Sequence, residues 1–246
     1  YVARAVITRN NERLAQLSRP FQIDRPLTPG IGSAATTNSR MPAAASLDVV
    51  SRLLGEALLF KHDTLLTPGV INFFMDQLDA DRPELQTITS ELRSGNFAGA
   101  GRRAFETGDQ MAAAFLQGLN LFTQRKWNQA QLQFSAALSL EPSFAPASFY
   151  LGACYAAVGR DSEAVTQWRR TLLASKTTSI EHGTLADALF RTRESNQALV
   201  LLRKALTIWP KDDALIKKIA IAHALELNYD ESLAIIEPYV ERNPTD

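Results

Sequence analysis

The chain has 246 residues, of which 46% are hydrophobic and 21% charged, so it is long enough to bury a core of ordinary size. Its formal charge is zero, which argues against the broad basic surface that nucleic acid attracts. No apolar run reaches the roughly 18 to 20 residues of a membrane-spanning helix, so we expect a soluble chain without membrane insertion.

The first 23 residues predict a short β-hairpin. Apolar and polar side chains alternate through YVARAVIT, the chain turns at Asn10 and Asn11, and a second extended stretch follows. An isolated hairpin is marginal in water, so it is either docked on helices or the end of an upstream β-domain, and we favour the second. Residues 24–45 are rich in Pro, Gly, Ser, Thr and Ala without a period, which predicts a linker.

Residues 46–110 predict divergent helical hairpins. Apolar residues at helical spacing predict a first helix from Ser46 to near Phe60. Thr67 followed by proline is typical of a helix start and opens a second helix. These two helices form either a further divergent hairpin or a cap.

A third helix is predicted from about Pro83, and a fourth, short one follows Gly95, Asn96 and Phe97 and closes at Gly108. The turn between them matches the turns of the repeats that follow. We therefore interpret residues 83–108 as a degenerate repeat.

From Met111 onward the chain repeats every 34 residues. Small residues open the second helix of each unit and recur inside the first, a large apolar residue recurs inside the second, and a proline closes most units. The first-helix small residues are Gly118, Gly152, Ala186 and Ala220; those opening the second helix are Ala130, Ala164, Ala198 and Ser232; the large residues are Phe134, Trp168, Leu202 and Ile236; the prolines are Pro142, Pro210 and Pro244, with Lys176 breaking the series.

This pattern resembles the tetratricopeptide repeat (TPR) family, whose unit is a 34-residue helix-turn-helix. The resemblance implies a mostly α fold, a right-handed α-solenoid of antiparallel helix pairs, with the short β-hairpin before it. It divides the chain into four repeats, 111–144, 145–178, 179–212 and 213–246. No capping helix follows the fourth repeat, although solenoids normally need one, so either further repeats follow or this face self-associates.

In the TPR family the first helices line a concave groove that binds a partner. By register, the resemblance places at this groove Phe115, Leu119, Phe122, Phe149, Ala153, Asp187, Phe190, Arg191, Lys217 and Ile221. The groove is thus apolar at one end and mixed at the other, which suits an apolar helix or strand of a protein or peptide partner better than a terminal carboxylate. The alternative is that upstream segments of the chain fill this groove internally.

The residues give no sign of catalysis, so we expect neither an enzyme nor a cofactor. The histidines, His62, His182 and His223, are far apart and belong to no metal-binding motif, and the single Cys154 is expected to be a small buried residue. The rival to a scaffold is a structural spacer or self-assembly module of a larger protein whose activity lies upstream.

The opening segment adds a second resemblance. YVARAVIT followed by RPFQI resembles the closing strands of β-regions that precede TPR arrays in some bacterial von Willebrand factor A-type proteins. It implies a fragment of a bacterial multidomain protein, adhesion-like or of the cell envelope, located outside the cytoplasm.

Overall fold

The computed structural model describes residues 2–9, 12–20, 54–55, 58–66, 86–173 and 177–243. The chain divides into two compact units, Tyr1–Met41 and Pro42–Asp246. The predicted linker at 24–45 and the helix predicted from Thr67 lie outside the described residues.

The first unit contains two strands, β1 (Val2–Arg9) and β2 (Glu12–Pro20). They pair antiparallel, with Arg9 opposite Glu12, and the register shifts between Ile7 and Thr8. Whether these strands close a larger β-domain stays a prediction.

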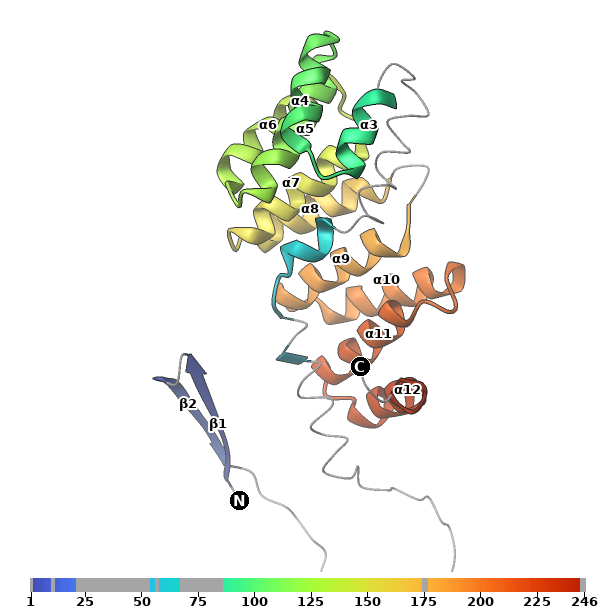
Figure 1. Ribbon diagram of the computed structural model, residues 1–246. Helices are drawn as coiled ribbons and strands as arrows, with labels where there is room; N and C mark the ends of the chain where they lie inside the picture. The colour runs from blue at the N-terminus through green and yellow to red at the C-terminus, as the bar shows by residue number, and fades with distance from the viewer. Residues whose placement is uncertain are drawn as a thin grey trace, which may run out of the picture. The chain divides into compact units, whose positions relative to one another are not determined.

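The described part of the second unit is helical (Figure 1). Its elements are η1 (His62–Leu66), α3 (Gln86–Arg93), α4 (Phe97–Glu106), α5 (Gln110–Thr123), α6 (Trp127–Leu140), α7 (Ala145–Ala157), α8 (Asp161–Thr171), α9 (Ser179–Arg191), α10 (Ser195–Ile208), α11 (Asp213–Leu225) and α12 (Tyr229–Arg242). From α5 onward the helices pack in consecutive pairs, and each pair packs on the next. The first helices of neighbouring pairs also touch, α5 with α7 and α9 with α11.

A residue in the left-handed backbone conformation makes the turn inside each hairpin. Arg125, Gly159, Arg193 and Leu227 have φ of 58°, 79°, 64° and 65°, and they lie at the 34-residue spacing of the repeat. In each turn this residue and the next one donate their N–H groups back to carbonyls of the last helical turn. The turn geometry is therefore the same in all four hairpins, although only Gly159 among these four residues is glycine.

Each hairpin closes by fitting a small residue of its first helix against a large residue of its second. A Cβ added at Gly118 would lie 2.6 Å from the ring of Phe134, and one at Gly152 would lie 2.8 Å from Nε1 of Trp168. Where the large residue is aliphatic, as Leu202 and Ile236 are, alanine replaces the glycine. These alanines and all four large residues are at most 1% exposed, so the small and large positions of the 34-residue pattern lie in the core.

The helix predicted to end near Phe60 is wrong in its last part. Leu58 to Lys61 are not helical, and the following residues form the single 3-10 turn η1. The position of this segment depends on its contacts with the repeats rather than on its own helical spacing. Among the described residues, no helix is long and apolar enough to cross a membrane.

Candidate functional site

Six of the apolar residues predicted to line an open groove are buried. Phe115, Leu119, Phe122, Phe149, Ala153 and Phe190 are each 0 to 2% exposed. The expectation of an exposed aromatic row is therefore corrected: these side chains belong to the core.

Packing between hairpins explains their burial. The ring of Phe115 lies 5.8 Å from that of Phe134 in its own hairpin and 5.0 Å from that of Phe144 at the start of the next. Phe122 and Phe149 both pack edge-on against Tyr150, with centroids 5.5 and 5.4 Å away. Phe115 and Phe122 thus join the first hairpin to the second, whereas Phe149 packs within its own hairpin, and no open apolar face remains at these positions.

A segment upstream of the repeats, residues 58–66, lies against their first helices. The buried hydroxyl of Tyr150 in α7 donates a hydrogen bond of 2.9 Å to the carbonyl of Leu65, 85 positions earlier. The ring of His62 packs 5.1 Å from Trp127, and that of Phe60 lies 6.3 Å from Trp168. We call residues 58–66 the groove segment.

The contacts of the groove segment extend beyond the second repeat. Asp63 pairs with Arg125 at 3.6 Å in the first repeat, and the guanidinium of Arg191 in the third lies 5.5 Å from the ring centroid of Phe60. Leu54, just upstream, packs against the apolar cluster of α11 and α12 in the fourth. Within residues 58–66, the contacts therefore favour the alternative that upstream residues of the chain fill the groove internally.

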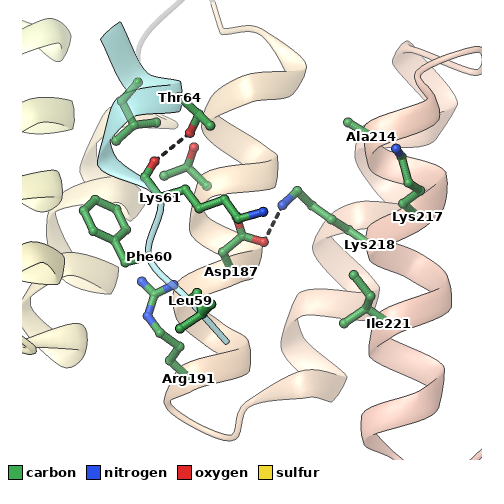
Figure 2. Close-up of a pocket in the computed structure, with 12 residues that line it drawn as sticks. Leu59, Phe60, Lys61, Thr64, Asp187, Arg191, Ala214, Lys217, Lys218 and Ile221 are labelled. Carbon is green, nitrogen blue, oxygen red and sulfur yellow. Dashed lines mark hydrogen bonds and ion pairs between the residues drawn. The ribbon is translucent and has the colours of Figure 1, made fainter. Parts of the chain in front are cut away.

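A cavity of about 260 Å³ remains between the groove segment, α9 and α11. Its lining residues are Leu59, Phe60, Lys61, Thr64 and Leu65 from the segment, Thr184, Asp187 and Arg191 from α9, and Ala214, Lys217, Lys218 and Ile221 from α11. Figure 2 shows the side chains of these three elements facing one another. Four residues that the sequence assigned to the groove, Asp187, Arg191, Lys217 and Ile221, meet here.

Positive charge dominates this cavity. Lys61, Arg191, Lys217 and Lys218 line it, whereas Asp187 is the one acidic residue among the described lining residues. Asp187 forms an ion pair with Lys218, which links α9 to α11. In Figure 2 the side chain of Lys61 extends towards the same carboxylate.

Arg191 lies at the edge of the cavity and is only partly paired. Its Nε donates a hydrogen bond of 2.7 Å to Asp161 at the start of α8, and its side chain is 10% exposed. Its two terminal nitrogens are buried beneath the groove segment and have no hydrogen-bond partner among the described residues. Burying N–H groups of a cation without acceptors opposes folding, so this contact is not optimised for stability.

Sequence reasoning missed the contribution of the groove segment and of Thr184, Ala214 and Lys218. Lys218 could have been found, because it adjoins the predicted Lys217 on the same helix. Lys61 interrupts an apolar run after Phe60. The sequence does not reveal that this segment contacts residues over a hundred positions later in the chain.

The described residues offer little for catalysis or metal binding. They contain no group of three metal-ligating side chains. Burial raises the pKa of the Cys154 thiol to about 12, so the thiolate needed for nucleophilic reactions is absent at neutral pH. Burial likewise raises the pKa of Tyr150, which keeps its hydroxyl protonated as a hydrogen-bond donor to Leu65.

Comparisons with known proteins identify the fold. No protein-family model and no curated protein matches the chain. Among solved structures, the chain is similar to YrrB, described as a TPR protein with an unusual peptide-binding site, with a TM-score of 0.53 and 21% identity over 59% of this chain and 75% of YrrB. It is also similar to MamA from Desulfovibrio magneticus RS-1, with a TM-score of 0.56 and 16% identity over 65% of this chain and 94% of that one. The helical repeats therefore have a TPR-like fold.

Proposed function

We propose that this chain is a protein-interaction scaffold that binds a peptide segment of a partner where α9 and α11 face the groove segment. The observation that carries the proposal is the cavity, which gathers Asp187, Arg191, Lys217 and Ile221, four groove positions of the TPR register, beside an aromatic side chain. A concave site with apolar walls and a few placed charges suits peptide recognition. That YrrB is described as having a peptide-binding site is consistent with this use of the fold.

A photo-cross-linking residue placed at Ala214 tests the proposal. Ala214 lines the cavity and is exposed, so a benzophenone side chain there should trap the partner from a lysate of the source cells. The matched control carries the same group at Val200 on α10, which is 71% exposed and does not line the cavity. A protein trapped at Ala214, absent at Val200 and lost when the half-buried Lys217 is changed to Glu supports the site. Equal trapping at both positions contradicts it.

The burial of the predicted aromatic row favours a second candidate, a structural spacer or self-assembly module within a larger multidomain protein. In that case the groove segment serves as a brace, and the strands β1 and β2 are the end of a β-domain of the von Willebrand factor A-associated type. Self-association would use the face of the fourth repeat. Sedimentation equilibrium tests the self-assembly form of this candidate, because only self-assembly predicts a mass that rises with concentration over the micromolar range.

A further inference from the structure

The groove segment covers the third repeat with few fixed contacts. It is irregular from Leu58 to Lys61, and Leu58 and Leu59 are 46% and 65% exposed. Its buried anchor, Leu65, lines the cavity but is fixed from the second repeat, because its carbonyl accepts the hydrogen bond of Tyr150. The residues from Leu58 to Lys61 are therefore the part of the segment that can detach at least cost.

Such a detachment would allow the terminal nitrogens of Arg191 to donate hydrogen bonds to a ligand. Beneath Phe60, its terminal nitrogens face a ring that offers only a cation–π contact and no hydrogen-bond acceptor. A carboxylate in place of that ring would accept charge-assisted hydrogen bonds from them. The Asp161 bond at Nε already fixes the guanidinium, so little conformational entropy would be lost on binding.

The charge of the cavity points to the same ligand chemistry. The groove segment adds the positive Lys61 to a lining that already holds Arg191, Lys217 and Lys218 against the single carboxylate of Asp187. A segment with an acidic residue at the place of Phe60 would complement this surface and leave the basic residue beside Asp187.

We infer that the groove segment is an internal occupant of the peptide site, and that the partner is an acidic peptide which displaces it from α9 and α11 and brings a carboxylate to Arg191. This inference rests on the proposed function and names its ligand class. The partner peptide would carry Asp or Glu at the place of Phe60, where the ring now faces Arg191, and could keep a basic residue after it beside Asp187.

Two synthetic nonapeptides test the inference: one with the sequence of residues 58–66 and one with the same sequence carrying Phe60→Glu. Binding of each, labelled with fluorescein, is measured by anisotropy to the full chain and to a variant with Phe60→Ser, which loosens the internal segment. We expect the acidic peptide to bind the variant about tenfold more tightly than the unchanged peptide does, as charge-assisted hydrogen bonds warrant. Arg191→Gln added to the variant should remove this preference, whereas Arg160→Gln, a control at a half-exposed arginine on another hairpin, should retain it.

Hydrogen exchange on the unmutated chain provides the second measurement, which does not depend on the variant. Saturating acidic peptide should speed amide exchange in residues 58–66 and leave α5 and α6 unchanged. Equal affinity of the two peptides, or unchanged exchange in the groove segment, would overturn the inference. If cross-linking at Ala214 still traps a partner in that case, the proposed function stands and only the ligand class and the displacement are wrong.

Discussion

Gly152 has no side chain because Trp168 occupies the adjacent space. The indole Nε1 donates a hydrogen bond of 2.9 Å to the carbonyl of Phe149, which fixes the ring where a Cβ on Gly152 would lie 2.8 Å away. Neither partner can move without breaking a buried hydrogen bond. The pairing of the smallest residue with the largest is thus a steric requirement of the second hairpin.

The change Gly152→Ala should therefore lower the free energy of unfolding by about 1 to 3 kcal/mol, the usual cost of overpacking a core. The matched control is Gly101→Ala in α4, where the new Cβ would meet atoms no closer than 3.6 Å. There the same substitution should raise the free energy of unfolding by about 0.5 to 1 kcal/mol through the helix preference of alanine. Urea denaturation measures both, and a shift of the same sign in the two variants would contradict the assigned packing.

Leu227 makes the turn of the fourth hairpin at a backbone angle that favours glycine. Its φ is 65° and its side chain is 71% exposed, so it incurs strain without contributing much packing. We predict that Leu227→Gly raises the free energy of unfolding by about 0.5 to 1 kcal/mol. Val200→Gly, at an equally exposed site inside α10, should lower it by about 1 kcal/mol. A Leu227→Gly variant less stable than the unmutated chain would show that its side chain packs.

At the scale of elements, the aromatic positions of the first helices hold the helices of the array together. Phe149 is fully buried, and its ring lies 6.4 Å from that of Trp168, so it connects α7 to α8. The next residue, Tyr150, connects α7 to the groove segment through its hydrogen bond to Leu65. Stability should therefore be sensitive to residues that the sequence assigned to binding.

Phe149→Ser should lower the free energy of unfolding by about 3 to 5 kcal/mol, the range for removing a buried aromatic side chain. Phe105→Ser provides the control, because Phe105 in α4 is 79% exposed and its loss should change stability by no more than about 0.5 kcal/mol. Thermal unfolding followed by circular dichroism compares the two. A melting midpoint of the Phe149 variant equal to that of the Phe105 variant would mean that the groove is open.

The repeats could be predicted from the sequence because their packing is local and periodic. The match of Gly118 to Phe134 and of Gly152 to Trp168 lies within one hairpin, so the 34-residue spacing carries it. The capping box of α9, formed by Thr178 and Glu181, is local too.

The groove segment could not be predicted in the same way. Its position depends on a hydrogen bond between residues 85 positions apart and on ring contacts across several hairpins, which leave no periodic trace in the sequence. The register identified Asp187, Arg191, Lys217 and Ile221 as neighbours, but it could not show that Phe60 covers Arg191. Helical spacing predicted a helix up to Phe60, but residues 58–61 lie against the repeats and are not helical.

At the scale of the whole molecule, the account depends on the chain occupying its own groove. The occupied groove explains why the terminal nitrogens of Arg191 lie beneath Phe60 without acceptors. It also sets the condition for binding, since a partner at α9 and α11 must share the site with residues 58–66 or replace them.

The most direct test is a nuclear Overhauser measurement on deuterated protein in which only His, Phe and Trp are protonated. We expect cross-peaks between His62 and Trp127, whose ring centroids are 5.1 Å apart, and between Phe60 and Trp168 at 6.3 Å. The pair Phe122 and Trp127, at 4.9 Å within one hairpin, is the internal reference that any folded first repeat must give. If the reference cross-peak is present and both groove-segment cross-peaks are absent, the groove is not occupied by its own chain and the account is contradicted.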